Sequence, residues 1–227
     1  MQHNDFNKEL LDFLSESPTP FHATRELAFR LEKEGFCKLD EADIWKLEKG
    51  EKYYLTRNDS SLIAFIYGNE ELSSSGIAMV GAHTDSPCLK IKPNAVMHKN
   101  GYIQLGVEVY GSPLLNPWFD RDLSLAGRLS GLNEKGELVH PLIDFKRAVA
   151  IIPSLAIHLD ANANKERSIN AQTDVPPIIM QSEETVSFEA ILCKQSGLKE
   201  ILDFELMFYD TQKPDFIGFL LCLTGLT

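Results

Sequence analysis

The sequence of 227 residues lacks the features that mark membrane, secreted and nucleic-acid-binding proteins. No apolar stretch approaches the roughly 18 residues that a membrane-spanning helix requires. The first residues, Met1 to Asp5, contain no basic region followed by an apolar one, so they do not resemble a secretory signal. The net charge is −11, which disfavours nucleic acid and anionic membranes as partners because both would repel the chain. We therefore expect a cytoplasmic protein.

Cysteine is also scarce. The four cysteines (Cys37, Cys88, Cys193 and Cys222) lie far apart and form no C-x-x-C pair, which favours reduced thiols over a disulfide framework. The remaining composition is ordinary for a globular protein, with 44% hydrophobic and 24% charged residues. A chain of this length can bury a substantial core, either in one large domain or in two small ones.

The stretch of residues 77–87 is the most informative part of the chain. Residues 77–82 are apolar or small, which predicts a strand buried on both faces, with a buried helix segment as the alternative. The run ends at His83 and Asp85, which share one side because positions i and i+2 of an extended chain point the same way. Ligands of open α/β sheets bind beyond the carboxyl ends of the strands. Two interpretations are open: a capped strand end with a hydrogen-bonded histidine, or a metal ligand whose tautomer a carboxylate fixes.

The residues before this stretch predict two helices and a hairpin. Apolar residues recur at helical spacing from Phe6 to Leu14. Thr19 caps a second helix, which has a proline in its first position and Gly35 after its end. Residues 53–56 and 62–67 flank an Asn-Asp turn and predict a hairpin. Two helices, a hairpin and a buried strand are typical of the opening half of an α/β catalytic domain.

After Lys92 the pattern changes to strands. Residues 102–110 alternate between apolar and polar, and residues 123–129 indicate another half-buried strand. Further strands are predicted at residues 186–193 and 204–209, the second returning towards the catalytic sheet. We therefore predict a β-rich module inserted into the α/β domain.

The segment 83–93 reads His83-Thr84-Asp85-Ser86-Pro87-Cys88-Leu89-Lys90-Ile91-Lys92-Pro93. It closely resembles the first metal-ligand motif of the M18 metallo-aminopeptidases, the aspartyl aminopeptidase family. Other segments match this family in its order, so the resemblance covers nearly the whole chain. These segments are Ser17-Pro18-Thr19-Pro20-Phe21-His22-Ala23, Trp118-Phe119-Asp120-Arg121-Asp122-Leu123, Ile152-Pro153-Ser154-Leu155-Ala156-Ile157-His158-Leu159 and Phe208-Tyr209-Asp210-Thr211-Gln212.

The resemblance implies an α/β fold: part of a zinc-peptidase catalytic domain, a mixed sheet with flanking helices, that carries an inserted β-rich lid and assembly domain. The division it implies is a first catalytic part at residues 1–90, the inserted lid and dimerisation domain at 91–202, and a truncated return to the catalytic domain at 203–227.

The resemblance also implies roles for single residues. His83 would be a metal ligand for one of two zinc ions, and Asp85 would orient its ring. His158 would contact the substrate bound by a neighbouring subunit, although a histidine on an apolar segment is by default a structural one. The implied partners are peptide substrates, with acidic amino-terminal residues preferred, and further copies of the chain that assemble through the β-rich domain.

The same resemblance identifies what is missing. In the family, a bridging Asp, a Glu-Glu pair, a further Asp and a late His follow the strand that resembles residues 204–212. None is identifiable here: no histidine and no Glu-Glu pair follows Gln212, and the last acidic residue is Asp215. The tail 216–223 resembles a family helix with the segment before it left out, which indicates an internal deletion, a disrupted reading frame or omitted residues. One imidazole cannot hold a catalytic zinc, so the alternative is an inactive fragment that acts only through assembly or regulatory contacts.

The other candidate residues have structural interpretations. His22 lies in the first turn of a helix, and His98 and His140 lie beside turns or strand edges. The alternating charges of Asp120-Arg121-Asp122 predict an ion-paired turn. Asp210 ends a strand without a neighbouring histidine.

Overall fold

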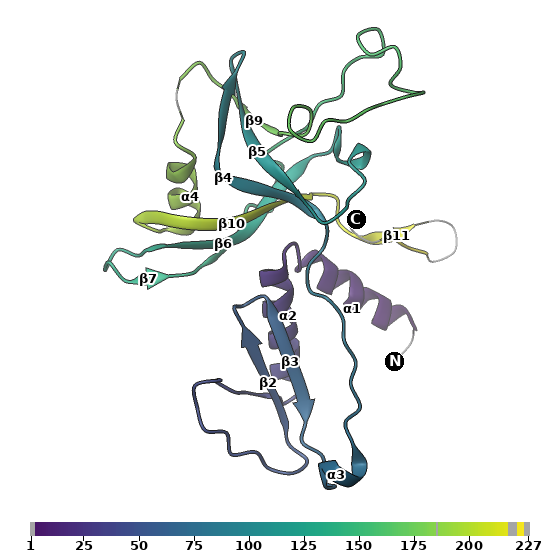
Figure 1. Cartoon of the computed structure of the whole chain (residues 1–227), viewed down its shortest axis with the longest axis vertical. Helices are drawn as coiled ribbons and strands as arrows, with labels where there is room; N and C mark the ends of the chain where they lie inside the picture. Colours follow the sequence, from purple (N-terminus) through teal and green to yellow (C-terminus); the bar gives the residue numbers. More distant parts are fainter. Residues whose placement is uncertain (1–2, 185, 218–221, 225–227) are drawn as a thin grey trace. The chain divides into compact units, whose positions relative to one another are not determined.

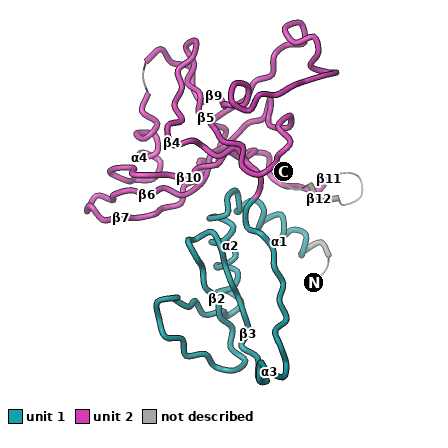
Figure 2. The backbone as a smooth tube through the Cα atoms, in the orientation of Figure 1, with its two compact units in different colours: residues 1–85 teal, residues 86–227 magenta. Residues whose placement is uncertain are grey.

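The computed structural model describes residues 3–184, 186–217 and 222–224. The chain forms two compact units, residues 1–85 and residues 86–227 (Figure 2). Both contain helices and strands, so the predicted α/β class is confirmed. No helix among the described residues is long and apolar enough to cross a membrane.

The first unit consists of helices and a small sheet. The sheet has the order β1-β2-β3, with β1 parallel to β2 and β2 antiparallel to β3. Helix α2 packs against the β2–β3 hairpin (Figure 1). The elements are α1 (His3–Ser15), α2 (Pro20–Lys33), β1 (Cys37–Lys38), β2 (Lys52–Arg57), β3 (Ser61–Ile66) and α3 (Leu72–Ser75).

Local sequence explains these elements. Thr19 is the N-cap of α2, and its side chain accepts a hydrogen bond from the backbone N–H of His22, as predicted. The turn of the hairpin places Asn58 and Asp59 at φ 52° and 53°, the left-handed conformation that short hairpin turns require and that Asn and Asp tolerate. The predicted helices and hairpin are therefore confirmed.

The prediction of a buried strand at residues 77–82 is wrong for this structure. The segment is not assigned to a strand or helix, and Val80 is 102% exposed. A buried strand needs neighbours that pair with its backbone and cover both faces, and no strand of the described residues pairs with this segment. An apolar run alone does not supply them.

The second unit is built around a seven-stranded sheet with the order β7-β6-β10-β4-β5-β9, in which β8 also pairs with β6 (Figure 1). A separate two-stranded sheet joins β11 to β12. The elements are β4 (Cys88–Lys99), β5 (Tyr102–Tyr110), η1 (Asn116–Trp118), β6 (Leu123–Leu132), β7 (Leu138–Val139), β8 (Leu142–Asp144), β9 (Ile178–Gln181), α4 (Phe188–Ser196), β10 (Glu200–Asp210), β11 (Asp215–Ile217) and β12 (Cys222–Thr224).

The core of this unit follows the alternation in its strands. Leu105 and Leu129 are fully buried, and α4 packs on β10, where the rings of Phe188 and Phe204 meet edge to face with centroids 6.0 Å apart. Gly127 lets β6 and β10 approach closely, because a Cβ there would lie 2.0 Å from a backbone oxygen of β10.

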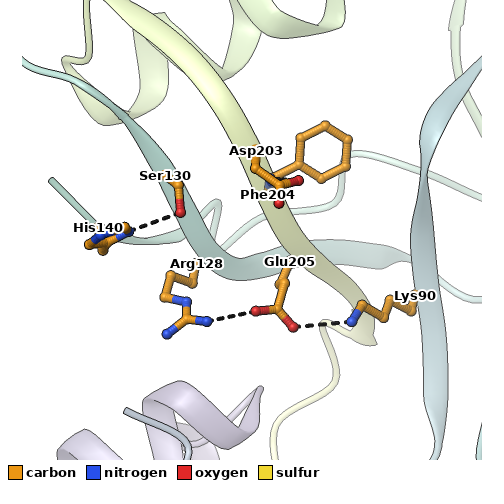
Figure 3. A network of polar contacts seen from close by, with 7 residues as sticks. All are labelled: Lys90, Arg128, Ser130, His140, Asp203, Phe204 and Glu205. Carbon is orange, nitrogen blue, oxygen red and sulfur yellow. Dashed lines mark hydrogen bonds and ion pairs between the residues drawn. The ribbon is translucent and has the colours of Figure 1, made fainter. Parts of the chain in front are cut away.

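Polar side chains also join the central strands (Figure 3). The carboxylate of Glu205 on β10 accepts hydrogen bonds from Arg128 on β6 over 2.7 Å and from Lys90 on β4 over 3.1 Å. Burial raises the pKa of Glu205, but the bonds to Arg128 and Lys90 outweigh burial and leave the pKa below its ordinary value. The network links three neighbouring strands.

Two further predicted elements, both in the second unit, are wrong. Residues 188–196 form helix α4 instead of a strand, because Ser187 caps it through a hydrogen bond from the N–H of Ala190 and Gly197 ends it in the left-handed conformation. The helix expected in the tail 216–223 is not observed in its described residues either, because 216–217 and 222–223 lie in the antiparallel strands β11 and β12, while residues 218–221 lie outside the described residues. An apolar run alone does not distinguish a strand from a helix.

The regular secondary structure within the span 91–202 is mainly strand, as predicted, and irregular segments make up most of the rest. Strand β10 crosses the expected boundary at residues 202–203 and pairs with both β6 and β4. The strand expected at residues 204–209 is thus present within the sheet of the second unit. The division into residues 1–90, 91–202 and 203–227 stays a prediction.

Candidate functional site

His83 lies near the end of the first unit, after the exposed segment 77–82. Its neighbour Thr84 fixes this part of the chain to the hairpin, because the Thr84 hydroxyl donates a hydrogen bond to the carbonyl of Ser60 over 2.7 Å. The side chains of His83 and Asp85 are 80% and 40% exposed. The motif is therefore presented to solvent.

The imidazole of His83 turns back on the chain. Its Nδ1 lies 2.7 Å from the backbone carbonyl oxygen of Asp85 and 3.4 Å from the carboxylate Oδ1 of the same residue. A carbonyl only accepts, so this contact places the proton on Nδ1 and the lone pair on Nε2. Nε2 makes no hydrogen bond to any described residue, so it is the atom that can bind a metal.

This geometry changes the expected role of Asp85. The prediction was that its carboxylate orients the ring, whereas the shorter contact comes from its backbone carbonyl. A backbone carbonyl fixes the tautomer of a histidine ligand as well as a carboxylate does. The roles of His83 as a ligand and of Asp85 as its orienting partner stay predictions.

The described residues do not complete a zinc site. They contain no group of three or more His, Cys, Asp or Glu side chains that could hold a metal ion. A catalytic zinc takes three protein ligands and a water. His83 fits as one nitrogen ligand of a zinc ion, and a single ligand does not make a catalytic zinc site.

His158, the predicted substrate contact, lies in the second unit. It is exposed on a turn in which the N–H of Leu159 donates to the carbonyl of Ala156 over 2.8 Å. Leu155, Ile157 and Leu159 around it are also exposed. An exposed histidine among exposed apolar side chains is typical of a contact surface rather than of a core.

The predicted ion-paired turn at Asp120-Arg121-Asp122 is confirmed. Arg121 bonds to the Asp210 carboxylate over 2.7 Å. Asp120 accepts a hydrogen bond from the Ser154 N–H over 2.8 Å, and the hydroxyl and N–H of Ser154 hold the pKa of Asp120 below its usual range.

Two of the other histidines, His22 and His140, have structural contacts. His22 is buried and its Nδ1 lies 2.8 Å from the Thr19 hydroxyl, and His140 contacts the hydroxyl of Ser130 over 2.9 Å (Figure 3). Sequence reasoning missed Arg167, whose guanidinium lies over the ring of Phe119, because a single arginine in a polar loop gives no pattern in one sequence.

The chain is similar to known proteins over nearly its whole length. Residues 13–223 match the family described as aminopeptidase I zinc metalloprotease (M18). A probable M18 family aminopeptidase 2 from Ectopseudomonas mendocina is 53% identical over 217 residues, which is 92% of this chain and 50% of that protein.

Solved structures are similar as well. The cryo-EM structure of the Ape4 and Nbr1 complex matches with a TM-score of 0.88 at 37% identity and covers 94% of this chain and 45% of that one. The S. cerevesiae mApe1 dodecamer matches with a TM-score of 0.78 at 27% identity and covers 96% of this chain and 51% of that one. The chain thus spans about half the length of the curated relatives it matches.

Proposed function

This chain belongs to the M18 family of aminopeptidases, and from that premise we propose that it supplies one half of a zinc-dependent aminopeptidase. The observation that supports this proposal is the geometry of His83, whose Nδ1 is engaged by Asp85 while Nε2 is left for a metal. The further ligands would come from the part of the family's length that this chain does not span.

In this proposal each residue has a limited task. His83 donates Nε2 to zinc, and Asp85 holds the ring in the required tautomer. Zinc in such a site polarises the scissile carbonyl and lowers the pKa of a bound water. The preferred substrates are peptides with acidic amino-terminal residues, which in a chain of net charge −11 requires cations placed locally at the site.

The β-rich unit is proposed to assemble with further copies of the chain. One relative is described as a dodecamer, and the exposed side chains of Leu155, Ile157 and Leu159 offer an apolar surface beside His158. His158 would contact the substrate held by a neighbouring copy. We place the assembled protein in the cytoplasm.

Complementation tests this function. The chain would be co-expressed with the carboxyl-terminal half of the Ectopseudomonas mendocina relative, and zinc content would be measured together with release of Asp, Glu, Ala and Lys from chromogenic amides. We expect weak zinc binding and no turnover for the chain alone. The complemented protein should bind zinc, cleave Asp and Glu amides best, and lose both zinc and activity in His83→Ala.

The rival function gives a different result. An inactive fragment that acts only through assembly would associate with the added half without zinc or turnover. Tight zinc binding and turnover by the chain alone would show that it contains ligands beyond His83.

A further inference from the structure

Residues 155–166 form the loop that carries His158, and this loop begins after Ser154 in the second unit. There the backbone N–H of Ser154 donates to Oδ1 of Asp120 over 2.8 Å. The N–H of Asp120 in turn donates to the carbonyl of Ile152 over 2.9 Å. Asp120 makes both bonds from the left-handed conformation, with φ 56°. The outgoing end of the loop is therefore fixed.

Arg167 fixes the returning end. Its guanidinium Cζ lies 3.9 Å from the ring centroid of Phe119, a cation–π contact. Its Nη1 donates to Oδ1 of Asn116 over 3.1 Å, and its Nη2 donates to the hydroxyl of Ser154 over 3.4 Å. Arg167 thus bonds the returning end to the outgoing one and ties both to residues 116–119.

The hydrogen bonds of the loop itself are local. The N–H of Leu159 donates to Ala156, and the N–H groups of Lys165 and Glu166 both donate to Asn162 over 2.8 Å. Such turns give the tip a shape but do not place it relative to the sheet. Within the part of the chain that the structure describes, the neck formed by Ser154 and Arg167 is where the loop is joined to the body of the unit.

We propose that Arg167 is a positioning residue that closes the neck of the 155–166 loop and so fixes where His158 is presented. This role rests on the substrate contact proposed above for His158. Arginine suits it because a planar fork can stack on a ring and donate in two directions at once, which a lysine ammonium cannot do in the same way. The ring, the amide and the hydroxyl accept the guanidinium directly, and its charge also helps to lower the pKa of the Asp120 and Asp174 carboxyl groups.

Backbone order parameters test the clamp without reference to activity. In Arg167→Ala, NMR relaxation should show the order parameters of residues 155–166 falling from about 0.85, the rigid value, to below about 0.6. In Arg167→Lys, the order parameters of the loop should lie between those of the wild type and those of Arg167→Ala. Phe119→Leu removes the ring but keeps the arginine, and it should lower the order parameters of the loop as well. Arg147→Ala is the matched control, because Arg147 is exposed and its hydrogen bond within the described part of the chain is to the neighbouring carbonyl of Ala148.

An unchanged loop in Arg167→Ala, or equal loosening in Arg147→Ala, would overturn the proposal. If Arg167→Ala does not fold, Phe119→Leu decides instead: a loosened loop in that variant supports the clamp, and a rigid loop overturns it.

The complemented enzyme separates this proposal from the one it rests on. We expect Arg167→Ala to lower kcat/KM about tenfold, the size of one strong charged contact, and to add nothing further in a His158→Ala background. If His158→Ala lowers kcat/KM but Arg167→Ala does not, Arg167 does not position the loop for catalysis. If His158→Ala has no effect, the role of His158 fails, and the order parameters still decide whether Arg167 closes the neck.

Discussion

Two apolar stretches of similar sequence character have opposite fates in this chain. Residues 77–82, before His83, are extended and exposed, whereas residues 123–129 form the buried part of β6. The second stretch is paired on one side by β10 and on the other by β8. The first has no partner strand among the described residues. Burial of a strand is thus decided by the elements that flank it, and the His83–Asp85 motif directly follows the stretch that has no partner strand.

The largest effect is expected in β6. Leu129→Ala removes a side chain that is 0% exposed and leaves a cavity in the core. We expect it to lower the free energy of unfolding by about 2–5 kcal/mol. Urea unfolding followed by circular dichroism measures the change. A loss below about 0.5 kcal/mol, the size of a surface substitution, would contradict the burial of this strand.

The next effect concerns the motif. Asp85→Ala removes the carboxylate that lies 3.4 Å from His83 but keeps the carbonyl contact of 2.7 Å. We expect zinc affinity of the complemented protein to fall roughly 10-fold, at the lower end of the range for a lost orienting partner, and His83→Ala to be far worse. Zinc titration of both variants measures this. A loss as large as that of His83→Ala would mean that the carboxylate itself is a ligand.

What the sequence could predict depended on where the determining residues lie. Thr19, Asn58 and Asp59 act on their own neighbours, so α2 and the hairpin could be read locally. Helix α4 was not predicted, although Ser187 and Gly197 are ordinary cap residues, because the apolar residues between them fit a buried strand as well as a helix. The geometry of the site was harder to predict, because neither the contact with the Asp85 carbonyl nor the contacts of Arg167 correspond to a recognisable pattern in a single sequence.

A smaller effect is expected from the carboxylate between β6, β10 and β4. Glu205 has a pKa below its ordinary value because Arg128 and Lys90 bond to its ionised form. The stability it contributes is therefore present above the unfolded pKa and is lost as the pH falls through the folded one. We expect Glu205→Gln to cost about 1 kcal/mol at pH 7. The difference in melting temperature between wild type and variant should shrink as the pH is lowered from about 5.

The exposed Glu134 provides the control for this pH dependence. Glu134→Gln should leave the melting temperature unchanged at every pH. If the two variants behave alike, the network around Glu205 does not stabilise the sheet.

The smallest effect is expected at Val80. Its side chain is fully exposed, so Val80→Ser removes no buried surface and should change the free energy of unfolding by less than about 0.5 kcal/mol. The matched substitution Val107→Ser, at a residue of β5 that is 1% exposed, should cost about 2 kcal/mol or more because it buries a hydroxyl in an apolar environment. Urea unfolding of both variants at several protein concentrations makes the comparison. An equally large loss at Val80 that grows with protein concentration would mean that a second chain covers residues 77–82 in solution. Residues 77–82 would then be buried by association with another chain. They would differ from β6 because their partner strand would come from a second chain, whereas the partner strands of β6 come from its own chain.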